Sequence, residues 1–146
     1  MNADIDTLAT ALLDGAPCIE TIQGARLAPS TIQGRGMFAT RAWATGEVLC
    51  VLDGQIVDAT RHPGVIDTLE WNALSREHLL VRPLRTSYGF INHARPPNLA
   101  IDDDGITLRA CLPIAPGDEL TLDYFAQPVP LAYLASEEAA ALRRST

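Results

Sequence analysis

Turn-forming residues interrupt this sequence at short intervals from Ile19 onward, and they limit the possible folds more than any other feature. Four such turns are Thr45-Gly46, Asp53-Gly54, Asp103-Asp104-Gly105 and Pro116-Gly117. Turns at this spacing leave only short segments between them, which favours short strands over long helices. The strands expected are 37–39, 48–52, 56–57, 99–101, 107–111 and 119–122. The expected fold class is mainly β with short helices.

Three segments instead show the apolar spacing of helices. Residues 5–13 form a short amphipathic pattern that ends before Pro17. Residues 65–80 place Ile66, Leu69, Ala73 and Leu80 roughly on one helical face. A last helix is expected over residues 130–144. It starts at a proline, has Glu137 and Glu138 in its middle, and ends in two arginines that suit the helix dipole.

A weak internal repeat relates two segments of the form strand, turn, strand. The matched residues are Ala39 with Ala110, Trp43-Ala44 with Ile114-Ala115, Gly46-Glu47 with Gly117-Asp118, and Leu49 with Leu120. Two related hairpins packed together would make a compact, strand-rich core. The alternative is a coincidence between two similar β-turns.

Composition indicates a folded, acidic protein. The chain has 146 residues, 47% of them hydrophobic and 20% charged, which suits a single globular domain. No apolar run approaches the ~18 residues of a membrane span. Residues 1–13 lack the basic residue of a secretory signal, so we expect a cytoplasmic protein that does not bind membranes. The net charge of −7 argues against direct nucleic-acid binding and suits a basic protein partner, unless it serves only solubility.

Cysteine and lysine usage narrows the chemistry further. Cys18, Cys50 and Cys111 are widely spaced and form no CxxC pair, so we expect reduced thiols and no metal site. All 11 basic residues are arginines. An enzyme that modifies lysine could therefore not modify the side chains of this chain.

Three stretches concentrate residues suited to binding or catalysis. The first, Gly34-Arg35-Gly36-Met37-Phe38, has two glycines that let a ligand approach the backbone closely. The second runs from Tyr88 to Asn98 and contains Asn92-His93 followed by a proline-stiffened loop. The third, residues 117–124, is an alternating strand that ends in Asp123-Tyr124. Taken singly, each stretch also has a structural interpretation: a plain turn, local turn-capping asparagines with a structural histidine, and a core tyrosine.

Together and in this order, the three stretches resemble the SET-domain family, particularly its small stand-alone viral and bacterial members. Residues 34–39 with Gly46-Glu47 resemble GRGxFA…GE, residues 92–98 resemble NHSCxPN, and residues 109–124 resemble RAxxxIxxGEELTxDY. The resemblance implies a β-clip fold with a C-terminal pseudoknot that brings Asn92-His93 next to Asp123-Tyr124. It also suggests three regions: an N-terminal helical segment (1–24), the SET domain (25–126) and a C-terminal helix (127–146).

The resemblance further implies an S-adenosylmethionine-dependent protein-lysine N-methyltransferase that acts on a basic protein or histone-like tail. Methyl transfer from a sulfonium is an in-line displacement that depends on alignment and a neutral amine. By family analogy, Tyr124 is the catalytic residue. The cofactor-binding residues would be Gly34, Arg35, Gly36, Met37, Asn92 and His93. The substrate channel would be lined by Tyr88, Phe90, Ile91 and Phe125.

The sequence also departs from the family pattern. Ala94-Arg95 stand where the family has Ser-Cys, and Leu52-Asp53-Gly54 stand where it has Tyr-x-Gly. Only residues 125–146 follow the last motif, so the final helix or a second subunit would have to close the lysine channel. Some of the small viral and bacterial SET proteins dimerise, and the resemblance to them implies a homodimer. Two alternatives remain: a non-catalytic SET-like domain that binds cofactor or a protein tail, and an unrelated strand-rich interaction domain.

Overall fold

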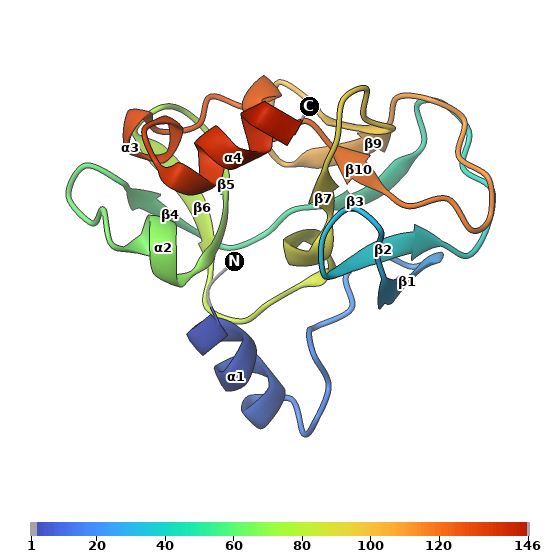
Figure 1. Cartoon of the computed structure of the whole chain (residues 1–146), viewed down its shortest axis with the longest axis horizontal. Helices are drawn as coiled ribbons and strands as arrows, with labels where there is room; N and C mark the ends of the chain where they lie inside the picture. The colour runs from blue at the N-terminus through green and yellow to red at the C-terminus, as the bar shows by residue number, and fades with distance from the viewer. Residues whose placement is uncertain (1–2, 146) are drawn as a thin grey trace. The chain divides into compact units, whose positions relative to one another are not determined.

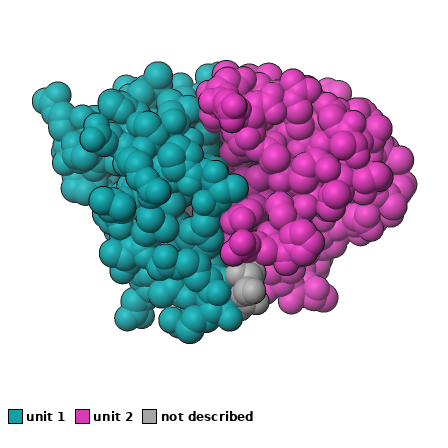
Figure 2. Space-filling model, turned by 90° about the horizontal axis from the view of Figure 1, so that it is seen from above, with its two compact units in different colours: residues 1–19, 53–85, 124–146 teal, residues 20–52, 86–123 magenta. Residues whose placement is uncertain are grey.

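A computed structural model describes residues 3–145 of the chain. The chain forms two compact units, each assembled from separate stretches of sequence (Figure 2). Unit 1 comprises residues 1–19, 53–85 and 124–146, and unit 2 comprises residues 20–52 and 86–123. Strands outnumber helices and the helices are short, which confirms the expected mainly β fold class. The two units do not test the division that the sequence suggested, into residues 1–24, 25–126 and 127–146. That division stays a prediction.

Unit 1 combines one antiparallel sheet with short helices. The sheet has the order β4-β6-β5, with β4 at Gln55–Asp58, β5 at Glu70–Ala73 and β6 at His78–Arg82. The helices are α1 (Ala3–Leu12), α2 (Val65–Thr68), α3 (Leu131–Leu134), α4 (Glu137–Ser145) and the 3₁₀ helix η2 (Tyr124–Ala126). Leu79 and Val81 of β6 share one buried cluster with Tyr133 of α3 and Ala139 of α4. The two C-terminal helices thereby cover the sheet (Figure 1).

The helix expected over residues 65–80 is wrong. Only Val65–Thr68 is helical, and the rest forms the hairpin of β5 and β6. The hairpin turns at Ser75, whose Oγ accepts hydrogen bonds from the amides of Glu77 and His78. β6 is also the central strand of its sheet and is buried along most of its length. Pairing with two neighbouring strands, a non-local effect, therefore overrides the local helical spacing.

The two terminal helical segments differ in how well they were predicted. The helix expected over residues 5–13 is confirmed as α1. The helix expected over residues 130–144 is instead two helices, α3 and α4. Ser136 separates them, because its Oγ donates to the carbonyl of Tyr133 (2.6 Å) and accepts from the amide of Ala139 (3.1 Å). Glu137 and Glu138 thus lie in the first turn of α4, where negative charge suits the helix dipole.

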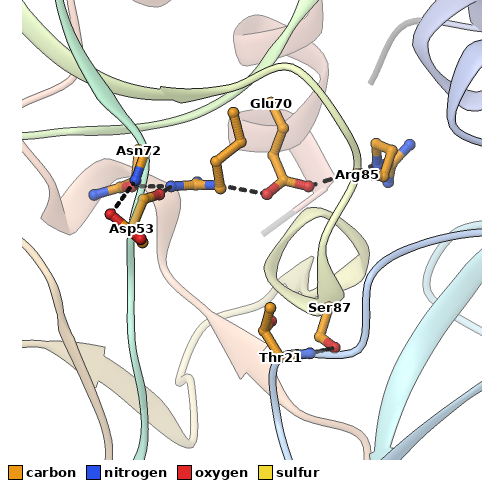
Figure 3. Close-up of polar contacts among 8 residues, drawn as sticks. Thr21, Asp53, Glu70, Asn72, Arg85 and Ser87 are labelled. Carbon is orange, nitrogen blue, oxygen red and sulfur yellow. Dashed lines mark hydrogen bonds and ion pairs between the residues drawn. The ribbon is translucent and has the colours of Figure 1, made fainter.

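A buried polar network runs through unit 1 (Figure 3). Glu70 is only 1% exposed and accepts a hydrogen bond from Nε of Arg82 at 2.5 Å. Nη1 of Arg82 also donates to Oδ1 of Asn72 and to the backbone carbonyl of Asp53, both at 2.9 Å. Arg85 lies 3.8 Å from the second oxygen of Glu70. One carboxylate therefore serves two buried guanidinium groups.

Arg85 extends this network to the N-terminal helix. Its Nη1 donates to Oδ1 of Asp6 in α1. The side chain of Arg85 is 3% exposed, whereas that of Asp6 is 40% exposed. The ion pair thus fixes α1 to the segment that follows β6, and it balances the second buried positive charge.

Unit 2 is built from small sheets and one 3₁₀ helix. β1 (Ala25–Pro29) and β2 (Arg35–Ala39) form an antiparallel hairpin. A second sheet has the order β3-β9-β8, with β3 at Val48–Val51, β9 at Thr107–Ala110 and β8 at Leu99–Ile101. The third sheet pairs β7 (Asn92–His93) with β10 (Thr121–Leu122), and the 3₁₀ helix η1 (Ser87–Phe90) precedes β7. Figure 1 shows these strands as short arrows joined by long connections.

The internal repeat corresponds to paired structure in unit 2. The amide of Ala39 donates to the carbonyl of Asp118, and the amide of Ala110 donates to the carbonyl of Glu47. Each copy therefore makes the same hydrogen bond to the other copy. Trp43 and Ile114, at equivalent positions, exchange two backbone hydrogen bonds of 2.9 Å. Both turns are capped in the same way. The carboxylates of Glu47 and Asp118 each accept a hydrogen bond from the backbone amide three residues earlier. The strands within one copy do not pair with each other, because β2 pairs with β1 and β3 pairs with β9. The two copies therefore bond reciprocally to each other, but they are not the two hairpins expected from the sequence.

The third sheet joins two distant stretches of the sequence. β7 and β10 run parallel, with Asn92 opposite Thr121 and His93 opposite Leu122. Asn92-His93 was expected to lie next to Asp123-Tyr124. The pairing confirms this for Asp123, which directly follows β10. The threading of the C-terminal segment through a loop stays a prediction. Within residues 3–145, no helix is long and apolar enough to cross a membrane.

Candidate functional site

The loop between β1 and β2 ends at Gly34, the first residue of the first motif, whose other residues lie in β2. Its ends are joined by a hydrogen bond from the amide of Ser30 to the carbonyl of Gly34 (2.9 Å). Gly34 has φ +47°, which side-chain-bearing residues rarely adopt, and a Cβ there would meet nothing within 4 Å. A Cβ at Gly36 would instead lie 2.3 Å from a carboxylate oxygen of Glu119. The first glycine thus leaves open space beside the backbone, while the second makes room for a side chain from the third motif.

Asn92 connects this loop to the rest of unit 2. Its Nδ2 lies within hydrogen-bond distance of the carbonyls of Gln33 (3.1 Å) and Arg35 (3.3 Å), and of Oε2 of Glu119 (2.9 Å). A reversed amide would place its oxygen against these acceptors, so the nitrogen is the atom that faces them. Among residues 3–145, no donor reaches Oδ1 of Asn92. The side chain therefore holds the loop with its nitrogen, and no described residue uses its acceptor oxygen.

Asn98 holds the third motif from the other side. Its Nδ2 donates to the carbonyl of Glu119 (2.8 Å), and its Oδ1 accepts from the amide of Thr121 (2.8 Å). Both motif asparagines thus make long-range hydrogen bonds to residues 119–121. The alternative that they only cap local turns is wrong.

His93 is a buried neighbour of Asp123. Its side chain has no exposed surface, and Nδ1 lies 3.8 Å from Oδ1 of Asp123, whose Oδ2 is 3.4 Å from Nε of Arg95. Burial lowers the pKa of His93 below its usual value, and Arg95 lowers it further. Asp123 and a hydrogen bond with the Leu122 backbone oppose that shift. The ring is therefore neutral near pH 7.

The expected channel residues of unit 2 lie together in and after η1. Tyr88, Phe90 and Ile91 are all buried, with exposed fractions of 8%, 7% and 2%. The guanidinium of Arg35, from the first motif, lies over the Phe90 ring at 5.0 Å from its centroid. This contact brings an expected cofactor residue and an expected channel residue together. Met37, the remaining residue of the first motif, is buried in β2 and accepts a backbone hydrogen bond from Leu120.

The last two expected site residues belong to unit 1. Tyr124 and Phe125 open η2 directly after Asp123, and both are half-buried. The Phe125 ring stacks on Tyr133 with centroids 6.2 Å apart, and Arg143 of α4 lies over it at 5.5 Å. The final helix thus contacts one of the residues expected to line the channel.

Two residues of this arrangement were not expected from the sequence. Ser30 precedes the first motif, and the Glu119 side chain was not assigned a role although it lies in the third motif. Ser30 Oγ lies 2.7 and 2.9 Å from the two carboxylate oxygens of Glu119. No local pattern signals this contact, because the two residues are 89 positions apart.

Family comparison agrees with the geometry of unit 2. The SET domain profile matches residues 34–125, which is more than half of the chain. The chain belongs to the SET-domain family. SET domains are generally S-adenosylmethionine-dependent methyltransferases that act on proteins, and the three motifs described above fall within the matched region. A search of curated protein sequences gives no significant match.

Proposed function

We propose that this SET-domain protein is an S-adenosylmethionine-dependent protein-lysine N-methyltransferase. The observation that carries the proposal is the position of Asn92. This one side chain joins the loop of the first motif to the third motif and keeps an acceptor oxygen unused among the described residues. These contacts between stretches that are distant in sequence support a single cofactor site within unit 2.

The cofactor would be held by the first and second motifs. The open backbone at Gly34 admits a ligand without steric conflict, and Oδ1 of Asn92 suits a donor such as the cofactor's α-ammonium group. Arg35, Gly36 and Met37 follow Gly34 in β2, and His93 follows Asn92 in β7; these four residues complete the proposed cofactor site. When bound, the cofactor supplies a methyl group attached to a positively charged sulfur.

The protein would prepare a lysine amine for that methyl group. Free lysine has a pKa near ~10.4 and must lose a proton before it can act as a nucleophile. The buried side chains of Tyr88, Phe90 and Ile91 would desolvate the amine, which lowers its pKa. The hydroxyl of Tyr124 would orient it. No dedicated base is needed, and we assign none.

The substrate proposed is a basic protein or a histone-like tail. The chain carries a net charge of −7, which favours encounter with a lysine-rich partner. The chain itself contains no lysine, so transfer to lysine must occur on another protein. The alternative, a non-catalytic SET-like domain, remains because Ala94-Arg95 replace the usual Ser-Cys and Arg95 contacts Asp123.

Calorimetric titration tests the cofactor site. S-adenosylmethionine and S-adenosylhomocysteine should each bind the chain with micromolar affinity, and Asn92→Ala should weaken both by at least about tenfold, since it removes the acceptor and releases the loop. Circular dichroism of the variant controls for folding. The absence of binding to the parent chain, or an equal affinity in a folded Asn92→Ala variant, would contradict the proposed site.

A further inference from the structure

Ser30, Asn92 and Glu119 form a three-way contact around Gly36. The Ser30 hydroxyl donates to Glu119, and Nδ2 of Asn92 lies 2.9 Å from Oε2 of Glu119 and 3.2 Å from Oγ of Ser30. The Glu119 carboxylate occupies the space that a side chain at position 36 would fill. These three residues come from the β1–β2 loop, β7 and the segment before β10. We call this contact the Ser30 latch.

The latch also shapes the loop locally. Oγ of Ser30 accepts hydrogen bonds from the amides of Ile32 (2.9 Å) and Gln33 (3.4 Å). The hydroxyl therefore acts as acceptor toward the loop and as donor toward Glu119. Because Glu119 carries the charge, its hydrogen bonds to Ser30 and Asn92 are of the stronger, charge-assisted kind. One carboxylate thereby orients both the loop backbone and the Asn92 amide.

We propose that Glu119, acting through Ser30, is a positioning residue that holds the β1–β2 loop and Asn92 in the geometry needed to bind cofactor. This inference rests on the proposed function, because the cofactor is what the positioned groups would bind. Glu119 itself need not touch the ligand, since both of its oxygens are engaged by the latch. Its removal should affect the binding of cofactor rather than the methyl-transfer step.

Three substitutions, two at Glu119 and one at Ser30, test the latch. Glu119→Ala removes both acceptor oxygens, whereas Glu119→Gln keeps one oxygen and the side-chain volume. The matched control is Ser75→Ala in unit 1. Ser75 makes the same local pattern as Ser30, because its Oγ accepts from the amides two and three residues later, but it lies in another loop. Ser30→Ala and Ser75→Ala therefore remove equivalent turn hydroxyls, and only Ser30 contacts Glu119.

The first readout needs no cofactor. Hydrogen exchange of the ligand-free protein should show faster exchange at Ile32 and Gln33 in Glu119→Ala, although Glu119 makes no hydrogen bond to either amide. Glu119→Gln should fall between the parent and Glu119→Ala, and Ser75→Ala should match the parent at these positions. Unchanged exchange in Glu119→Ala would overturn the latch itself.

The second readout is cofactor binding. Glu119→Ala and Ser30→Ala should raise the dissociation constant of S-adenosylhomocysteine about tenfold, with a smaller rise for Glu119→Gln and none for Ser75→Ala. Faster loop exchange combined with parental affinity would overturn the positioning role. If the parent chain binds no cofactor, the proposed function fails, while the exchange readout still decides whether the latch exists. Should Glu119→Ala not fold, Glu119→Gln gives both readouts and Ser30→Ala gives the affinity readout, because Ser30→Ala removes the hydrogen bonds of Ile32 and Gln33 directly.

Discussion

Tyr124→Phe should lower the rate of lysine methylation about 100-fold and leave the affinity for S-adenosylmethionine close to that of the parent. The substitution removes one hydroxyl from the last residue of the third motif, which opens η2. That hydroxyl is proposed to orient the substrate amine, whereas the cofactor is proposed to bind residues 34–37, Asn92 and His93. The loss should therefore appear in kcat at saturating cofactor, measured by transfer of labelled methyl groups.

The matched control is Tyr133→Phe. Tyr133 lies in the same unit, is buried in the core, and also loses only a hydroxyl in this substitution. It has no proposed part in binding or transfer, so its rate should stay near that of the parent. A Tyr124→Phe variant as active as Tyr133→Phe would contradict the catalytic assignment. If Tyr124→Phe instead lowers the affinity for the cofactor, Tyr124 would be assigned to cofactor binding.

Removal of the buried carboxylate of Glu70 is expected to have the largest effect on stability. Glu70→Ala leaves the guanidinium groups of Arg82 and Arg85 buried without their shared partner. Breaking a buried pair in this way costs about 3–5 kcal/mol of unfolding free energy, because an uncompensated charge stays in the interior. Urea denaturation followed by circular dichroism measures this loss.

Glu70→Gln and Glu47→Gln form a matched pair for the same measurement. Both remove a carboxylate charge without changing side-chain size, but Glu47 pairs with Arg41 where both side chains are largely exposed. Glu70→Gln should lower the denaturation midpoint clearly, and Glu47→Gln should leave it nearly unchanged. Equal midpoints for the two variants would show that the buried network adds little to stability.

The motif regions of this fold were predictable because their signals are local. Turn residues such as Thr45-Gly46 and Pro116-Gly117 delimit strands that the structure contains, including β3 and β9. The repeat could be read from sequence because each copy needs the same residues at its turn, Ala44 with Glu47 and Ala115 with Asp118. The resemblance to SET domains then pointed to the residues that unit 2 brings together.

Other parts of the structure depend on contacts that no local pattern reveals. Residues 65–80 were assigned to a helix because their apolar spacing fits one, whereas Glu70 and Arg82 are opposite each other on paired strands. Ser136 divides the C-terminal helix through hydrogen bonds to both of its neighbours. The contact of Ser30 with Glu119 joins distant parts of the chain. In each case, the local structure depends on partners far apart in sequence or on one capping side chain.

The most direct test of lysine methyl transfer is mass spectrometry after incubation with methyl-labelled S-adenosylmethionine and lysine-rich proteins such as histones and ribosomal proteins. Because the chain contains no lysine, any labelled methyl-lysine must come from the added protein. We expect labelled methyl-lysine on a basic protein, and much less with Tyr124→Phe. Cofactor binding without label on any lysine across this set would contradict the enzymatic proposal and favour a binding domain.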